Sequence, residues 1–561
     1  MPQYDETKLL TSLKEIGVID AAKLDQIFEQ SKRAQISFEA ALIKSNLITD
    51  KNLGQTVAEI LNTPFVHLAD ETLDDSVVTM LPASYAKKHL IIPYKLENGN
   101  VLLATNNPQN SLLLSLVKQK LDSNIQVKYA TQLDLENTFS IYKKDLQTVF
   151  NEMMEGLNYK SINKAEGETS IANIVDLFIE YAYETKASDI HIEPYENISQ
   201  VRFRLDGVLH DQVQIPKDVH ENVVSRIKVL SKLRTDEHLS AQDGKLRRKM
   251  EYEDLDIRVS ILPLVEGEKC VLRLLASHGK DFSLSELGMD EQSLEKITKA
   301  YSNPHGMILT TGPTGSGKTT TNYAVLKMLN KREVNITTIE DPVEFDIEGV
   351  NQIQVNQKTN LTFAAGLKSI LRQDPDIVLV GEIRDAETAG IAINAAMTGH
   401  LVLSTLHTND AATTLPRLID MEIEPFLVAS TINIIVAQRL VRKICNKCKV
   451  SKEVPVKELE AKLPKNLTKK HFGKKKTLTI YEGKGCAVCN HTGYSGRLGI
   501  FELLEITPEI RELVMQKANA DVLREAAIKE GMITMLEDGI KKIASGATTA
   551  AEVLRVTRTE A

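Results

Sequence analysis

The run from Gly312 to Thr319 has the residue types and spacing best suited to chemistry. It reads G-P-T-G-S-G-K-T and matches the phosphate-binding pattern G-x-x-x-x-G-K-[ST] in full. Its glycines let the backbone turn so that N–H groups point at phosphate oxygens, while its lysine brings a positive charge toward the β- and γ-phosphates. We expect ATP to contact Gly312, Pro313, Thr314, Gly315, Ser316, Gly317, Lys318, Thr319 and Thr320, with Thr319 also a ligand of Mg²⁺.

Hydrolysis at a phosphate loop also needs an acid that handles the attacking water. The apolar run 377–380 is followed by Gly381 and Glu382, so glycine stands where an aspartate is usual. An acid at the tip of a strand faces the ligand crevice of an α/β sheet. We therefore predict that Glu382 orients the water. The alternative is a solvated turn acid beside Arg384.

Two further groups of polar residues flank predicted strands. Glu340, Asp341 and Glu344 end one strand, and we expect them on the cofactor side of the site, where carboxylates orient Mg²⁺ through water. An ordinary acidic turn between strand and loop is the alternative. His400 and His407 stand at the two ends of another strand. Histidines near phosphates donate hydrogen bonds and respond to the nucleotide state, so both are candidate catalytic residues. A structural role is the alternative for each histidine.

Four of the five cysteines form two C-x-x-C pairs, Cys445 with Cys448 and Cys486 with Cys489. Two such pairs can bring four thiolates around one tetrahedral zinc ion. With four sulfur ligands no coordination position is open, so the predicted zinc site is structural. A redox dithiol is the alternative. The fifth cysteine, Cys270, lies in an apolar run.

Alternating strands and helices must position these residues. Short apolar runs between helical patterns have the rhythm of parallel βαβ units, and the phosphate loop directly follows the first of them. The sequence therefore predicts an α/β domain with a parallel sheet that binds ATP, at residues 290–440. The expected strands are 307–311, 336–340, 377–380 and 401–406.

The residues before and after this domain have sequence patterns of other domain types. Asp206-Gly207 lies between two strand-like runs, a strong hairpin signal. Two more strands and an amphipathic helix at 221–233 follow, which predicts an α+β domain with an antiparallel sheet. The expected divisions are 1–157 (paired helical units, then a small α/β module), a linker at 158–169, the α+β domain at 170–280, the cysteine module at 441–500 and a helical end at 501–561.

The length, charge and apolar content of the chain exclude some classes of protein. The chain has 561 residues, 42% of them apolar and 26% charged, as in proteins with several globular domains. A net charge of −8 argues against nucleic-acid binding. The apolar run 426–440 is broken by polar residues such as Gln438, so no transmembrane helix is expected. The acidic N-terminus is unlike a signal peptide, which predicts a cytoplasmic protein.

From about residue 188 onward these motifs, in this order, resemble the secretion and pilus-assembly ATPases of the PilB and GspE type. The resemblance covers the phosphate loop, the acidic run and the histidines, and the remaining matches are 187–194, 202–207, 371–377, 381–385 and 398–409. It implies a RecA-like core after a PAS-like domain, with ATP, Mg²⁺ and Zn²⁺ as cofactors. It also implies that Glu382 is the catalytic acid and that glycine before it is normal.

The resemblance further implies a homohexamer on the inner face of the cytoplasmic membrane. Arg202, Arg204 and Arg226 would reach the ATP of a neighbouring subunit, and solvated strand arginines are the alternative. The implied function is type IV pilus assembly through an inner-membrane platform protein and cytoplasmic assembly proteins. Type II secretion, a DNA-translocating motor and a nucleotide-gated scaffold are the alternatives. The N-terminal part is similar to cyclic di-GMP receptors of the family but lacks the start of their motif, which favours protein docking.

Overall fold

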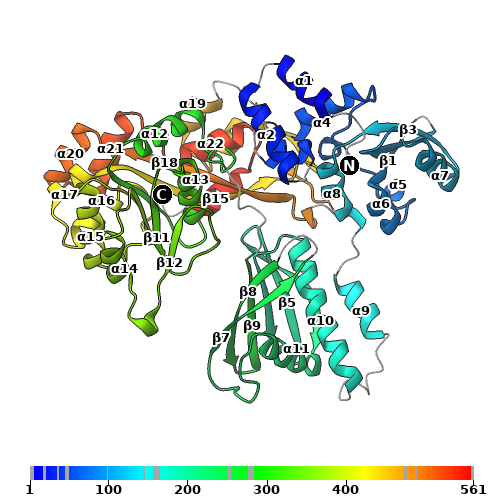
Figure 1. The fold of residues 1–561 in the computed structure, drawn as a ribbon, viewed down its shortest axis with the longest axis horizontal. Helices are drawn as coiled ribbons and strands as arrows, with labels where there is room; N and C mark the ends of the chain where they lie inside the picture. Colours follow the sequence, from blue (N-terminus) through cyan, green and yellow to red (C-terminus); the bar gives the residue numbers. More distant parts are fainter. Residues whose placement is uncertain are drawn as a thin grey trace. The chain divides into compact units, whose positions relative to one another are not determined.

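The computed structural model describes residues 6–16, 21–34, 37–44, 48, 50–71, 73–97, 99–142, 146–155, 165–250, 254–275, 283–472, 477–486 and 489–557. The chain forms two compact units (Figure 1). The first unit combines Met1–Lys144 with Ile444–Lys452 and Tyr481–Ser495. The second unit contains Asp145–Lys443, Glu453–Ile480 and Gly496–Ala561.

The first unit begins with the helices expected in the first sixty residues. They pack around a buried core that includes Leu9, Leu24, Phe38 and Leu53. A three-stranded sheet with flanking helices follows, in which β1 is antiparallel and β3 parallel to β2. The elements are α1 (Glu6–Ile16), α2 (Ala21–Ala34), α3 (Phe38–Lys44), α4 (Asp50–Ile60), η1 (Leu68–Asp70), α5 (Asp75–Val78), α6 (Ala83–His89), β1 (Ile91–Glu97), β2 (Asn100–Thr105), α7 (Ser111–Leu121), β3 (Asn124–Tyr129), α8 (Gln132–Thr138) and η2 (Phe139–Tyr142).

The second unit opens with an antiparallel sheet of strand order β6-β5-β4-β9-β8-β7. The predicted hairpin is present, with Asp206 and Gly207 at φ of +48° and +87°, as a type I′ turn requires. Helix α10 begins at Ala165, inside the stretch expected to be a linker, whose earlier part lies outside the described residues. The elements are α9 (Leu146–Glu155), α10 (Ala165–Glu184), β4 (Asp189–Pro194), β5 (Ile198–Leu205), β6 (Val208–Pro216), α11 (Lys217–Leu230), β7 (Gln242–Lys249), β8 (Asp254–Leu264) and β9 (Gly267–Leu275).

The ATPase part of the second unit is built on a sheet of order β12-β11-β13-β14-β10-β15-β18. The four predicted strands β10, β11, β13 and β14 are present, and each pairs in parallel with its neighbours among them. The short strand β12 was not predicted. The elements are α12 (Glu291–Tyr301), β10 (Gly306–Thr311), α13 (Lys318–Leu329), β11 (Ile336–Glu340), β12 (Asn351–Gln354), η4 (Gln357–Thr359), α14 (Phe363–Ile370), β13 (Ile377–Val380), α15 (Ala386–Met397), β14 (Leu401–Leu406), α16 (Thr414–Asp420) and α17 (Pro425–Thr431).

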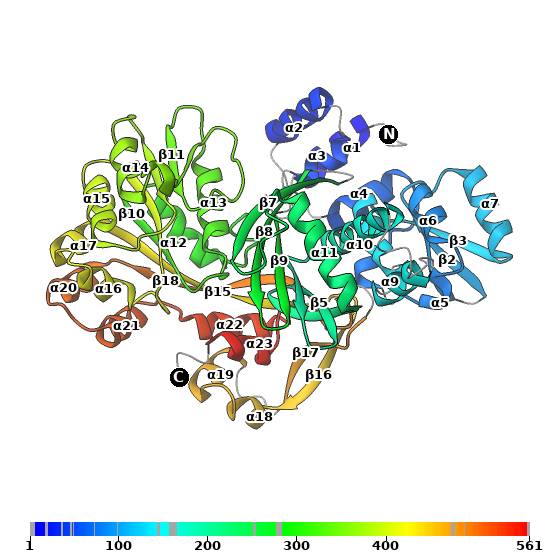
Figure 2. The ribbon, with the colours of Figure 1, turned by 90° about the horizontal axis from the view of Figure 1, so that it is seen from below.

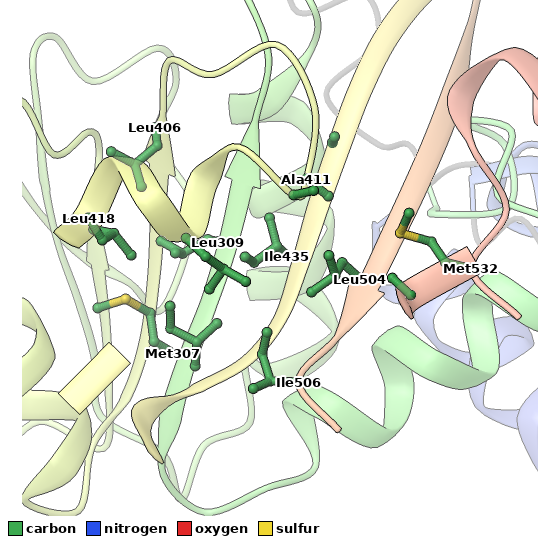
Figure 3. Close-up of a cluster of buried hydrophobic side chains, with 14 of the residues drawn as sticks. Met307, Leu309, Leu406, Ala411, Leu418, Ile435, Leu504, Ile506 and Met532 are labelled. Carbon is green, nitrogen blue, oxygen red and sulfur yellow. The ribbon is translucent and has the colours of Figure 1, made fainter. Parts of the chain in front are cut away.

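Successive side chains of this sheet enter two separate cores, as the period of two along a strand requires. Met307 and Leu309 of β10 join the core with α14 to α17, whereas Ile308 joins the core with α12 and α13. Figure 3 shows part of the first core, with Ile435 beside Leu309 on neighbouring strands and Leu418 on helix α16. Strands β10, β13 and β14 are buried along their whole length, and their sequences are mostly apolar.

The last two strands of the sheet are long (Figure 2). Strand β15 (Ile432–Ile444) runs past the boundary expected at residue 440, and β18 (Tyr494–Glu505) runs past that at residue 500. The C-terminal region is helical after β18. The remaining elements are β16 (Lys449–Pro455), α18 (Val456–Glu460), α19 (Lys465–Phe472), β17 (Thr477–Gly483), α20 (Pro508–Met515), α21 (Ala520–Lys529), α22 (Met535–Ala544) and α23 (Ala550–Thr557).

Candidate functional site

The phosphate loop joins β10 to α13 and has the backbone that its glycines permit. Gly312, Gly315 and Gly317 have φ of +143°, +78° and +89°, a region that side chains disfavour. A Cβ atom on Gly312 would lie 2.5 Å from the backbone oxygen of Gln438 on β15. Glycine at position 312 therefore allows the loop to lie directly against the neighbouring strand.

Lys318 starts helix α13 and is buried within the loop. Its Nζ donates hydrogen bonds to the carbonyls of Gly312 (2.7 Å) and Pro313 (3.2 Å). Burial lowers the pKa of Lys318, Glu382 opposes this shift, and Arg439 adds to it. The exposed Thr319 follows in the first helical turn. An N-terminal turn with free N–H groups, a lysine and a hydroxyl can hold a nucleotide phosphate with its magnesium ion.

Gln438 anchors the loop, and sequence reasoning did not assign it a role. The side chain is 2% exposed and lies in β15. Its Nε2 donates to the carbonyl of Ser316 at 2.7 Å, and its Oε1 accepts from Thr321 Oγ1 at 2.7 Å. A polar residue within an apolar strand was the available signal, because buried amides need partners.

Glu382 follows β13, on the same edge of the sheet as the phosphate loop. Its carboxylate accepts hydrogen bonds from Arg384 (2.5 Å) and lies 3.1 Å from His407 Nε2. Burial alone would raise the pKa of Glu382, but Arg384 and His407 outweigh it and lower that pKa. A carboxylate that stays ionised at a strand tip can orient water and accept its proton.

Gly381, before Glu382, has little room for a side chain. A Cβ atom there would lie 3.2 Å from both Glu340 Cα and the carbonyl oxygen of Ile339 on β11. Its N–H also donates to the Ile339 carbonyl at 2.8 Å. Close approach of the two strand ends therefore accounts for glycine at the position where an aspartate is usual.

The three acids predicted for the cofactor side differ in burial and in hydrogen bonding. Glu340 is 3% exposed and accepts hydrogen bonds from Thr338 (2.6 Å), Gln352 (3.2 Å) and Tyr323. Asp341 and Glu344 are exposed in the loop that follows. The Glu340 carboxylate is therefore occupied by hydrogen bonds within the protein, whereas the carboxylates of Asp341 and Glu344 are accessible to solvent.

The two histidines lie at opposite ends of strand β14. His407 follows β14 and contacts Glu382, but His400 precedes β14, and its Nδ1 lies 2.9 Å from the carbonyl of Ala395. A strand of this length separates its ends by roughly 20 Å. Within one chain His400 therefore does not meet His407 or Glu382 and instead contacts the end of α15 (Ala386–Met397), and its catalytic role stays a prediction.

Two of the three predicted arginines, Arg202 and Arg204, have ion-pair partners in their own domain. Arg202 Nη1 lies 3.3 Å from Glu193, and Arg204 Nε lies 3.4 Å from Asp189. Arg226 lies on α11, and its buried Nε has no hydrogen-bond partner among the described residues. Among the described residues of one chain, none of the three arginines forms a hydrogen bond or ion pair with the phosphate loop.

Arg258 of β8 makes a contact that the sequence did not indicate. Its Nη2 donates to the carbonyl of Val343 at 3.3 Å and lies 3.6 Å from a carboxylate oxygen of Glu344. Both partners belong to the loop at residues 341–350, which follows β11. Arg258 therefore links the antiparallel sheet to the acidic loop of the ATPase part.

The four cysteines of the two C-x-x-C pairs converge. Their Sγ atoms all lie within 4.8 Å of one another, at 3.9 Å for Cys445 to Cys486, 3.8 Å for Cys448 to Cys489 and 3.7 Å for Cys486 to Cys489. Sulfurs around zinc at about 2.3 Å are separated by about 3.8 Å in a tetrahedron. Backbone N–H groups also point at the sulfurs, for example from Gly485 to Cys448 at 3.2 Å. This donor set fits zinc.

None of the helices in the described residues is both long and apolar enough to cross a bilayer.

Comparisons with known proteins agree with this geometry. The profile of the family described as Type II/IV secretion system protein matches residues 164–555, and that of the MshEN domain matches residues 61–147. The Type IV pilus assembly ATPase PilB of Myxococcus xanthus is 37% identical over 551 residues, covering 96% of either chain. The Type II secretion system protein HxcR of Pseudomonas aeruginosa is 47% identical over 388 residues, 69% of this chain and 77% of its own.

A solved structure is similar in fold. The Legionella pneumophila ATPase DotB has a TM-score of 0.51 and 21% identity, and the match covers 69% of this chain and 95% of that chain. The parallel sheet predicted from the strand rhythm and the RecA-like fold implied by the resemblance are both confirmed.

Proposed function

Since this chain belongs to the Type II/IV secretion system protein family and is an ATP-hydrolysing motor, we propose that it drives type IV pilus assembly through an inner-membrane platform protein. One observation supports it most: Lys318 and the Glu382–His407 pair lie at the same edge of one parallel sheet. Full-length similarity to a pilus assembly ATPase supports the specific task.

In this proposal ATP binds with its phosphates over the N-terminus of α13. Lys318 would exchange its bonds to the loop carbonyls for bonds to the β- and γ-phosphates, and Thr319 would hold Mg²⁺. Mg²⁺ would neutralise charge that builds up on the phosphates. Glu382 orients the attacking water, and His407 keeps that carboxylate in place. The carboxylates of Asp341 and Glu344 would contact the magnesium ion through water molecules.

We propose that the working form is a homohexamer. Arg202, Arg204 and Arg226 would then approach the ATP of a neighbouring subunit, where cations accelerate phosphoryl transfer. Arg202 and Arg204 must first leave Glu193 and Asp189. This exchange of partners would couple ATP binding to movement of the antiparallel sheet.

The remaining proposals concern location and cofactors. We place the protein in the cytoplasm, at the inner face of the membrane, with the cytoplasmic assembly proteins of the pilus. The cysteines would hold a structural zinc ion. The N-terminal part, matched by the MshEN domain profile, would dock a protein partner. We propose no nucleic-acid partner, because the net charge is −8.

Type II secretion is the second candidate, because HxcR has higher identity over a shorter segment than PilB. Deletion of the gene separates the two functions. Loss of surface filaments with normal protein export supports pilus assembly, and the reverse result supports secretion.

The motor assignment is tested with Lys318→Ala and Glu382→Gln. We expect Lys318→Ala to abolish ATP binding and filaments while the protein remains folded. We expect Glu382→Gln to bind ATP but to lower phosphate release by at least about a hundredfold, because a general base is lost. Lys331→Ala, an exposed lysine just after α13, is the matched control and should behave as the wild type.

Three results would contradict the assignment. Filaments at wild-type density with Lys318→Ala would exclude a motor that uses this site. Unchanged phosphate release with Glu382→Gln would favour a nucleotide-gated scaffold. Turnover that rises when DNA is added would favour a DNA translocase.

A further inference from the structure

Gln352 occupies the centre of a hydrogen-bond network between the phosphate-loop helix and the acidic loop. It lies on the short edge strand β12 (Asn351–Gln354) and is partly buried. Its Oε1 accepts from the N–H of Ile347 at 2.7 Å, and its Nε2 donates to the carbonyl of Phe345 at 3.2 Å. One side chain therefore satisfies two backbone groups of the loop at residues 341–350.

The same amide also reaches the end of β11. Gln352 Nε2 lies 3.2 Å from Glu340 Oε1 and 3.4 Å from the hydroxyl of Tyr323. The Tyr323 hydroxyl in turn donates to the other oxygen of Glu340. Because the Ile347 N–H needs an acceptor, the amide orientation is fixed, and its NH₂ group must face Glu340.

Tyr323 connects this network to the phosphate loop. It lies one helical turn after Thr319 on α13, so the two side chains share a helix face. Tyr323 is 1% exposed, and its ring meets that of Phe345 edge-on at 4.7 Å between centroids. The acidic loop is thus attached to α13 by a ring contact and by the hydrogen bonds of Glu340 and Gln352.

We propose that Gln352 is a positioning residue for ATP hydrolysis. It fastens the loop carrying Asp341 and Glu344 to α13, through Glu340 and Tyr323, so that these carboxylates keep a fixed place relative to Thr319. Glu340 serves as the buried link in this network and does not meet the metal. The inference rests on the proposed role of Asp341 and Glu344 on the magnesium side of the site.

The test replaces Gln352 by methionine, which is similar in length but has no amide. We expect kcat to fall about tenfold, the affinity for ATP to stay within twofold, and the Mg²⁺ concentration for half-maximal activity to rise at least threefold. Gln354→Met, an exposed position on the same strand, is the matched control and should leave all three quantities unchanged.

Tyr323→Phe removes one hydroxyl and keeps the ring contact, so it tests the network if Gln352→Met does not fold. We expect a fall in kcat of at least threefold with unchanged affinity for ATP. The double variant should be no worse than Gln352→Met alone, because both substitutions break one network.

Several outcomes would overturn the proposal. One is a Gln352→Met protein with wild-type kcat and Mg²⁺ requirement. Another is a lower kcat that is fully explained by the fraction unfolded, with no change in Mg²⁺ requirement. Asp341→Asn with Glu344→Gln tests the underlying role separately: wild-type Mg²⁺ dependence in that variant would refute the role of the carboxylates, whatever Gln352→Met shows.

Discussion

Replacing Gln438 by methionine should loosen the phosphate loop without changing any residue expected to touch ATP. The substitution removes two hydrogen bonds of 2.7 Å, to Ser316 and Thr321, from a side chain that is 2% exposed. A buried polar group left without a partner costs about 1–3 kcal/mol. The Thr321 hydroxyl can rotate, but the Ser316 carbonyl cannot, so we expect a local loss of about 2–3 kcal/mol.

Hydrogen exchange of the loop amides measures this loss directly. A decrease of about 2–3 kcal/mol in local opening free energy should speed exchange at residues 314–319 roughly thirtyfold to 150-fold. We also expect KM for ATP to rise, because a mobile loop must be ordered on binding. Gln516→Met, at an exposed position after α20, is the control and should leave both measurements unchanged.

The reasoning would be wrong if exchange in the loop of Gln438→Met stayed within threefold of the wild type. It would also be wrong if exchange increased equally in all parts of the ATPase sheet, since that result indicates global destabilisation.

Two further predictions concern stability and metal. Hydrogen bonds from Arg555 and Arg442 outweigh burial and lower the pKa of Glu552 from 4.5 to about 2. Glu552 should therefore stabilise the fold by roughly 3 kcal/mol above pH 4.5, and this stabilisation should disappear as the pH falls toward 2. Denaturant unfolding of Glu552→Gln and wild type should differ at pH 7 and converge at low pH; a constant difference would contradict the pKa shift. For the metal, native mass spectrometry should find one zinc ion per chain, lost in Cys445→Ser; metal-free wild-type protein purified without chelator would contradict the site.

The chemistry of the phosphate loop could be predicted because its residues are consecutive. The strand before it and the helix after it are local patterns, and together they fix where Lys318 lies. Glu382 was predictable for a similar reason, since an acid directly after an apolar strand faces the ligand edge of a parallel sheet.

The supporting contacts could not be predicted from local patterns. Gln438 and Arg258 bond to groups far away in sequence, and Gln352 reaches Tyr323 on another element, so these partners depend on sheet order and domain packing. Their polarity within strands signals a partner but does not identify it. The separation of His400 from His407 was predictable, because the two residues stand at the two ends of one strand and only His407 follows it.

The position of β18 changes what counts as the ATPase domain. This strand comes after all four cysteines yet pairs beside β15 in the catalytic sheet, so the cysteine segment is an insertion within the domain. A fragment that ends at residue 440 would leave β15 with an unpaired edge, which invites aggregation. Conversely, the length of the insertion can drift over evolution at little energetic cost, because its two ends are already held together.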